Sequence, residues 1–146
     1  MSKAVPFETT LEVRDTCLCL HTQRAARALA RRFDEALRPA GLTNGQFSLL
    51  MSLNRPQPPA MAPVANLLAM DRTTLTAALK PLERQGLVTV GVDPADRRSR
   101  LLILTDAGRE TLAAAVPIWR ETHAAVEAAL PTLDARELRT ALNALA

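Results

Sequence analysis

The sequence predicts a mainly α-helical fold with one small β-hairpin, and three observations support this prediction. Aromatic residues make up only 3% of the chain and tyrosine is absent, so alanine and leucine supply much of the apolar surface, and both favour helices. Apolar residues recur at spacings of three and four along most of the chain, as on one face of a helix. Only residues 87–90 and 101–104 resemble short strands.

Size, charge and hydropathy exclude several classes of protein. The chain has 146 residues, of which 48% are hydrophobic; this suits a folded body with its own core and argues against disorder. A net charge of +3 permits a polyanionic partner without requiring one. No stretch resembles a signal peptide or the roughly 20 apolar residues that cross a bilayer. We therefore expect a cytoplasmic protein with reduced cysteines and no membrane partner.

The first half of the chain should begin with two helices, one over about 11–38 and another that starts after Thr43. The first of them is expected as a single helix and follows a loosely held tail at 1–10. Its apolar stripe comprises Leu18, Ala25, Leu29, Phe33 and Leu37. Thr43 and Gln46 then form a capping box at the start of the next helix, in which each side chain satisfies a free backbone amide.

Two short helices follow in the centre of the chain, separated by a tight turn. Residues 63–68 form the first of them. Asp71 is a favourable N-cap for the second, and Gly86 suits its end. Pro81 lies inside this second helix and removes one amide, so we expect a distorted last turn there but no early end.

The two strand-like runs flank turn-forming residues at 93–96 and so predict one hairpin. Thr105 caps a long helix after it, and Asp134 opens a last helix. The inner face of that last helix should carry Leu138, Leu142 and Leu145. The first and last helices have more apolar surface than two short central helices can cover. We therefore expect an obligate dimer through the N- and C-terminal helices.

The two central helices have the order of a helix-turn-helix, in which the second helix enters the DNA major groove with its N-terminal side chains first. Hydroxyl side chains allow close approach and can bond phosphates or base edges, and a helix N-terminus itself favours phosphate. We therefore expect a group of residues at this end to bind double-stranded DNA. They are Arg72, Thr73, Thr74 and Thr76, with Lys80 one turn further along.

The hairpin adds a second basic element beside that helix. Its tip carries Arg97, Arg98 and Arg100, and an arginine on a flexible loop can enter a narrow minor groove. Asp96 would repel phosphate if it were free, so we expect it to orient Arg98 through a charge-assisted hydrogen bond. Basic hairpins and threonine-rich helix starts are each common on protein surfaces, but their order and spacing here favour DNA binding.

Several segments of the sequence match one known family. The central ones are Met70-Asp71-Arg72-Thr73-Thr74-Leu75-Thr76, Leu79-Lys80-Pro81-Leu82-Glu83-Arg84-Gln85-Gly86-Leu87-Val88 and Asp93-Pro94-Ala95-Asp96-Arg97-Arg98. The flanking ones are Leu42-Thr43-Asn44-Gly45-Gln46-Phe47 and Leu104-Thr105-Asp106-Ala107-Gly108. From about residue 11 to 146 the chain resembles the MarR (multiple antibiotic resistance regulator) family of winged helix-turn-helix transcription factors.

The resemblance implies a domain plan and a mode of action. It implies an N-terminal dimerisation helix at 1–42, a winged helix-turn-helix at 43–104 and C-terminal dimerisation helices at 105–146. It also implies a homodimer that binds a pseudo-palindromic operator, usually as a repressor released by a small molecule or an oxidant. In the same matching Asp96 and Arg98 take wing positions, and the threonines take recognition-helix positions.

Many members of the family bind small, often aromatic, anions between the dimerisation helices and the DNA-binding lobe. Here His21, Arg24 and His123 could supply cationic contacts, and Trp119 could supply an apolar wall. Each also has a plainer interpretation, because arginines on long helices are usually solvated and aromatic residues on an apolar stripe usually pack in a core. No cofactor is implied.

The two cysteines suggest redox control as an alternative. Cys19 lies near the position of the sensing cysteine in the organic-hydroperoxide branch of the family, although that branch activates its thiol with tyrosine hydroxyls. Cys17 and Cys19 should lie on nearly opposite faces of one helix, where a disulfide between them would break the helix. Two histidines are too few to complete a convincing metal site. Buried, unreactive thiols are the favoured interpretation.

Two other classes of protein are alternatives to a DNA-binding regulator. An enzyme is not expected, because the chain has no Gly-rich phosphate loop, no His-Glu metal motif and no nucleophile elbow. A winged-helix module that binds only proteins is the other alternative. The cationic hairpin and Arg72 argue against it.

Overall fold

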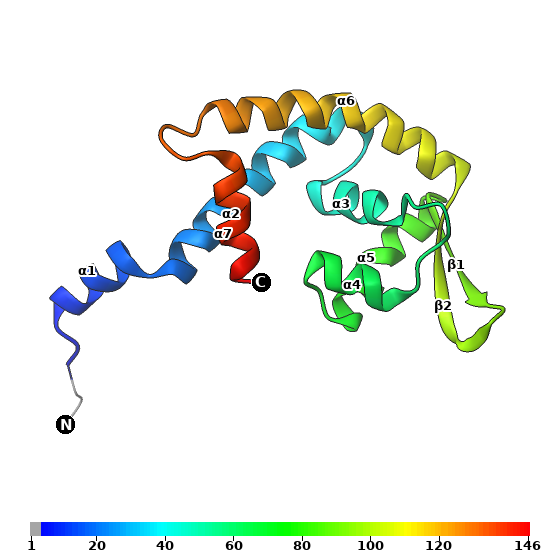
Figure 1. Cartoon of the computed structure of the whole chain (residues 1–146), viewed down its shortest axis with the longest axis horizontal. Coiled ribbons are helices and arrows are strands. Elements are labelled where there is room, and N and C mark those ends of the chain that lie inside the picture. The colour runs from blue at the N-terminus through cyan, green and yellow to red at the C-terminus, as the bar shows by residue number, and fades with distance from the viewer. Residues whose placement is uncertain (1–3) are drawn as a thin grey trace. The chain divides into compact units, whose positions relative to one another are not determined.

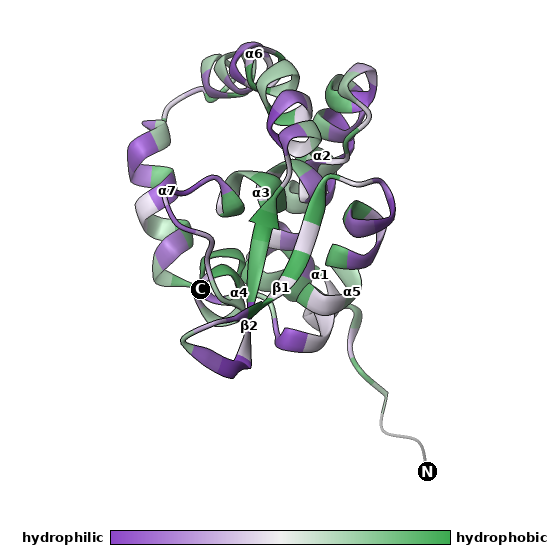
Figure 2. Cartoon of the chain, turned by 90° about the vertical axis from the view of Figure 1, so that its right-hand side faces the viewer, coloured by the Kyte–Doolittle hydropathy of each residue, from purple (hydrophilic) through white to green (hydrophobic). Residues whose placement is uncertain are grey.

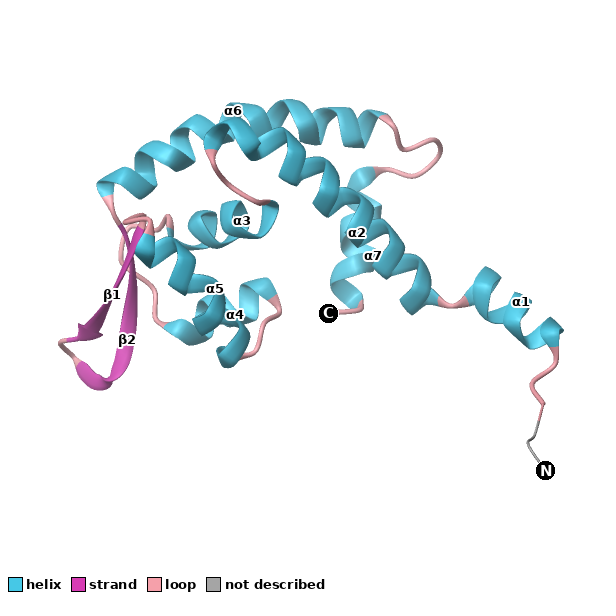
Figure 3. Cartoon of the chain, turned by 180° about the vertical axis from the view of Figure 1, so that it is seen from behind, coloured by secondary structure: helices cyan, strands magenta, loops and turns pink. Residues whose placement is uncertain are grey.

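In a computed structural model, which describes residues 4–146, the chain is mainly helical with one β-hairpin (Figures 1 and 3). The elements in order are α1 (Phe7–Thr16), α2 (Leu18–Leu37), the short 3-10 helix η1 (Arg38–Ala40), α3 (Asn44–Leu53), α4 (Met61–Leu68), α5 (Arg72–Arg84), β1 (Val88–Asp93), β2 (Asp96–Leu104), α6 (Asp106–Ala128) and α7 (Ala135–Ala144). This confirms the predicted mainly helical fold with a β-hairpin, whereas the predicted dimer is not tested by one chain. The chain divides into two compact units, one ending at Arg32 and the other running from Phe33 to Ala146.

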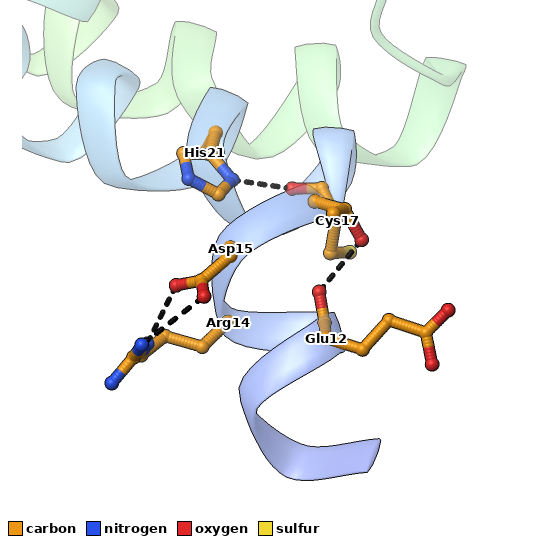
Figure 4. A network of polar contacts seen from close by, with 6 residues as sticks. Glu12, Arg14, Asp15, Cys17 and His21 are labelled. Carbon is orange, nitrogen blue, oxygen red and sulfur yellow. Dashed lines mark hydrogen bonds and ion pairs between the residues drawn. The ribbon is translucent and has the colours of Figure 1, made fainter. Parts of the chain in front are cut away.

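In the first unit, the expected single helix over 11–38 is wrong, because two helices meet at Cys17. Helix α1 already begins at Phe7, within the expected tail, of which residues 1–3 lie outside the described part of the chain. The Cys17 backbone is extended, with φ −69° and ψ 111°. Its Sγ accepts a hydrogen bond from the Leu20 amide at 3.4 Å, and its carbonyl accepts one from His21 Nδ1 at 2.7 Å (Figure 4). Cys17 therefore acts as an N-cap for α2, in the way a serine would.

The first unit has no buried residue among those described up to Arg32. Cys19 is exposed and Cys17 is half-buried, so the expectation of buried thiols is wrong within one chain. Large apolar side chains are also exposed here, namely Val5, Phe7, Val13, Leu18 and Leu29. Without a core of its own, this pair of helices needs another surface to stabilise it.

The second unit contains the hydrophobic core. Its largest fully buried side chains come from α3, α4, α5, the hairpin and the end of α2, and they are Leu37, Leu49, Leu50, Val64, Leu75, Leu82, Val88 and Leu102. The predicted capping box is present: the Thr43 hydroxyl accepts from the Gln46 amide at 3.2 Å, and Gln46 Oε1 accepts from the Thr43 amide at 3.1 Å. It sets the start of α3 and therefore the entry of the chain into the core.

The hairpin pairs β1 and β2 antiparallel, with Val88 opposite Leu104. Figure 2 shows strands that are hydrophobic near the core and hydrophilic toward the tip. A third segment joins the sheet, since Ala60 forms an isolated bridge with Leu101 and the Leu102 amide donates to the Pro59 carbonyl at 2.9 Å. This pairing ties the start of α4 to the hairpin.

Helix α7 begins as predicted, with the Asp134 carboxylate accepting from the Arg136 amide at 2.8 Å. The leucines expected on its inner face, however, are not inside: Leu138 is half-buried, Leu142 is exposed, and Leu145, which directly follows the helix, is exposed as well. The sequence pattern shows that they share one face, but the structure of one chain leaves that face uncovered. Across residues 4–146, the helices are all too short or too polar to span a membrane.

Candidate nucleic-acid interface

Helices α4 and α5 form a helix-turn-helix. Ala69 adopts the left-handed conformation at φ 52° and ends α4, and the next amide, that of Met70, donates back to the Ala65 carbonyl at 2.9 Å. Helix α5 starts directly after this turn. It is anchored by Leu75, Leu79 and Leu82 on its buried face, so its opposite face is presented to solvent. Pro81 lies inside α5 without ending it.

The N-terminus of α5 is built around Asp71. Its carboxylate accepts a hydrogen bond from the Thr74 amide at 2.7 Å, and bonds from the Thr74 amide and side chain lower the pKa of Asp71. The carboxylate thus stays ionised and holds the first turn of the helix. Thr76 donates its hydroxyl proton to the Arg72 carbonyl at 2.8 Å, which leaves the oxygen lone pairs and the methyl group of Thr76 for a ligand.

The predicted recognition residues are all exposed: Arg72, Thr73, Thr74, Thr76 and Lys80. Three of them, Arg72, Thr76 and Lys80, line a hollow of about 340 Å³ together with Arg100 from the hairpin. Met61, Leu79, Glu83 and Val90 complete the lining. Sequence reasoning missed Glu83 and Val90. The position of Glu83, three residues after Lys80, was a readable signal for the same helix face, whereas Val90 reaches the hollow only through the pairing of the hairpin.

The basic residues of the hairpin lie in β2 and not in the turn itself, which corrects their expected place on a flexible loop. The turn consists of Pro94 and Ala95, and Arg97, Arg98 and Arg100 are exposed on the strand that follows. The register pairs Val92 with Arg100 and Asp93 with Asp96. Residues 97–99 therefore bulge out with no partner on β1.

Asp96 contacts Arg98, but through the backbone. Its carboxylate accepts a hydrogen bond from the Arg98 amide at 3.0 Å, and the ion pairs of the described residues do not include these two side chains. The expected charge-assisted bond is present, while its donor is the main chain and not the guanidinium. Arg98 therefore keeps its charged group directed to solvent.

Trp119 and His123 lie beside hollows in the second unit. The Trp119 ring stacks between Phe47 and His123, with ring centroids 6.1 and 4.8 Å away. A hollow of about 480 Å³ opens on one side of Trp119, and its lining is mainly apolar: Phe47, Met51, Leu67, Leu68 and Val116, with Ser48, Ser52 and Arg120 as the polar members. A smaller hollow of about 210 Å³ includes His123. Arg120 is the cationic group that sequence reasoning missed.

The remaining candidates lie in the first unit and are not joined into a site there. His21 and Arg24 are exposed, and the His21 ring is bonded to the Cys17 carbonyl (Figure 4). The Cys19 Sγ accepts a hydrogen bond from Gln23 Nε2 at 3.2 Å. From residue 4 to the C-terminus, His, Cys, Asp and Glu side chains form no cluster that could hold a metal ion.

Comparisons with known proteins agree with this arrangement. The model of the MarR family matches residues 42–99. The transcriptional regulator MosR of Mycobacterium tuberculosis, solved in complex with DNA, is 40% identical and superposes with a TM-score of 0.81 over 89% of this chain and 93% of that one. The repressor CouR of Rhodococcus jostii, bound to a DNA duplex, is 30% identical with a TM-score of 0.72, over 98% and 96% of the two chains.

Among curated proteins, the transcriptional activatory protein BadR of Rhodopseudomonas palustris is 35% identical over 59% of this chain and 51% of its own length. The chain spans about half the length of the curated relatives it matches first. These comparisons confirm a non-enzymatic regulator and give no support to a winged-helix module that avoids DNA. On its fold, its helix-turn-helix with a β-hairpin wing and these matches, the chain belongs to the MarR family of DNA-binding transcriptional regulators.

Proposed function

We propose that this protein is a homodimeric repressor that binds a pseudo-palindromic operator and is released by a small aromatic or anionic effector. The observation that carries the proposal is the hollow in which the exposed recognition-helix residues Arg72, Thr76 and Lys80 lie beside the strands of the wing. In this arrangement α5 enters the major groove, and Arg97 and Arg98 reach the adjacent minor groove.

The dimer is supported by the apolar side chains that one chain leaves exposed. Phe7 and Leu18 near the N-terminus are 68% and 69% exposed, and Leu145 near the C-terminus is 63% exposed. Large exposed apolar groups on terminal helices favour burial against a second copy. A two-fold dimer presents two recognition helices, so its operator should contain two inverted half-sites about one helical turn apart.

The effector is supported by the hollow beside Trp119. Its aromatic and aliphatic walls suit a small aromatic ring, and Arg120 at its lining suits a carboxylate or phosphate. The hollow is built from α3, α4 and α6. A ligand there would contact both the long helix α6 and the first helix of the helix-turn-helix, and could change the spacing of the recognition helices.

Operator binding can be tested by selecting duplexes from a random library and measuring affinity by fluorescence anisotropy at two salt concentrations. Binding should weaken steeply with salt, and Arg98→Ala should weaken it by at least about fivefold with an unchanged melting temperature. Arg109→Ala, which also removes one exposed arginine, is the matched control and should change affinity little. Equal affinity of wild-type protein and Arg98→Ala would remove the wing contact from the proposal.

Release can be tested on the same complex with a panel of aromatic carboxylic acids. An acid that releases the DNA should also raise the melting temperature of the free protein, and Trp119→Ala should abolish both effects. A reporter gene placed behind the selected operator then distinguishes repression from activation. Release that persists in Trp119→Ala would place the effector elsewhere.

A thiol-based release is the second candidate, because Cys19 is exposed and Cys17 lies at the N-terminus of α2. If Cys19 is the sensor, an organic hydroperoxide should release DNA from wild-type protein and not from Cys19→Ser. A hydroperoxide response that survives in Cys19→Ser would rule out this assignment.

A further inference from the structure

One peptide group in the wing is held at both of its polar atoms. The Arg98 amide donates to the Asp96 carboxylate at 3.0 Å. The Arg97 carbonyl, which belongs to the same peptide, accepts from Arg100 Nη1 at 3.1 Å, and that nitrogen also donates to the Ser99 carbonyl at 3.3 Å. The side chains of Asp96 and Arg100 thus fix the Arg97–Arg98 peptide, the first at its N–H and the second at its C=O.

These hydrogen bonds lie in a part of the hairpin where the β1–β2 ladder forms none. The register leaves residues 97–99 without partners on β1, so the ladder does not determine their conformation. Both bonds involve a charged group, which makes them stronger than ordinary hydrogen bonds. Because the peptide is planar, holding its N–H and C=O restricts ψ of Arg97 and φ of Arg98 together, and these angles set the directions in which the two side chains leave the wing.

We propose that Arg100 is a positioning residue for the wing, which acts with Asp96 to aim Arg97 and Arg98, and is not itself a phosphate contact. The proposal rests on the proposed contact of Arg97 and Arg98 with DNA. It replaces the sequence-based expectation that all three arginines act alike. One nitrogen of the Arg100 guanidinium is committed to two carbonyls of its own chain, which gives this exposed arginine a structural role that does not require a DNA contact.

A double-mutant cycle separates the two roles of Arg100. Arg100→Ala alone should lower operator affinity by at least about fivefold, since both neighbours lose their fixed direction. In a protein that already carries Arg97→Ala and Arg98→Ala, adding Arg100→Ala should not change operator affinity, because the side chains that Arg100 positions are absent. An independent phosphate contact would instead lower affinity by the same factor in both backgrounds and overturn the proposal.

A second measurement uses the full-length protein without DNA, so it does not depend on the proposed function. In Arg100→Ala, the Arg98 amide should exchange with water faster, while the amides of the paired ladder residues Thr89 and Ile103 keep their protection and the melting temperature is unchanged. An unchanged exchange rate of the Arg98 amide would overturn the proposal. Faster exchange along the whole hairpin would overturn it as well, because it would mean that the wing unfolds as a whole. If the double variant Arg97→Ala/Arg98→Ala binds the operator as tightly as wild type, the proposed DNA contact fails. The exchange measurement still tests whether Asp96 and Arg100 fix the Arg97–Arg98 peptide.

Discussion

Thr105 joins three elements of the second unit, and replacing it with valine tests how that junction is stabilised. Its hydroxyl donates to the Gly86 carbonyl at 2.7 Å and accepts from the Gly108 amide at 3.0 Å, while its own amide donates to the Leu87 carbonyl at 3.1 Å. Thr105 therefore caps α6 and at the same time holds the end of α5 and the start of β1. Valine has nearly the same shape and replaces the hydroxyl with a methyl group, which can neither donate nor accept these bonds.

The expected cost follows from two lost interactions. Loss of the N-cap bond costs about 1 kcal/mol, and loss of the bond to Gly86 costs about 1 kcal/mol more. The total of about 2 kcal/mol corresponds to a melting temperature about 4–8 °C lower for a chain of this size. Because Gly108 is buried, its amide has no easy replacement partner, so the cap should account for at least half of the loss.

Scanning calorimetry at one fixed protein concentration measures this effect, since the stability of a dimer depends on concentration. Thr105→Ser is the matched control, because it keeps the hydroxyl and loses only a methyl group. It should retain most of the wild-type melting temperature. If Thr105→Val and Thr105→Ser melt at the same temperature, the hydroxyl does not stabilise the junction.

Three further predictions concern the core, pH and base recognition. A Cβ at Gly108 would meet the Leu87 carbonyl, so Gly108→Ala should destabilise by about 1–3 kcal/mol, whereas Gly45→Ala has open space and should melt at or above the wild-type temperature. Hydrogen bonds from the Asn44 amide and side chain, at the start of α3, lower the pKa of Asp34 in the folded protein. The stability that Asp34 contributes should therefore be complete above about pH 4 and be lost as pH falls through this lowered folded pKa. In Asp34→Asn, melting temperatures measured across acid pH should lack this loss. Thr74→Ala should cost about 1–3 kcal/mol in binding the selected operator and less on random duplex; equal losses on both would make Thr74 a backbone contact.

Most helix boundaries could be predicted because their signals are local. The capping box of Thr43 and Gln46 and the N-caps Asp71, Thr105 and Asp134 depend on side chains and amides within three residues of one another. The break at Cys17 escaped prediction for a physical reason. The apolar spacing continues through it, and a thiol is a weak acceptor that rarely marks a helix start.

The candidate site was predictable as a set of residues but not as an arrangement. The threonines after Asp71 and the arginines after Asp96 follow turn and cap signals in the sequence. The register shift between Val92 and Asp93 decides which of these arginines has a guanidinium hydrogen-bonded to the main chain. A one-strand pattern contains no information on that shift, because register is a property of two paired strands.

The amino-acid order of this chain was enough to establish most of its helices, its hairpin and its family, since periodicity, caps and turns act over a few residues. Folding in three dimensions was needed to bring Arg100 into the hollow with Arg72 and to bridge Ala60 to Leu101. These features depend on contacts between residues far apart in the chain. Such contacts follow from the packing of whole elements, which no short stretch of sequence specifies.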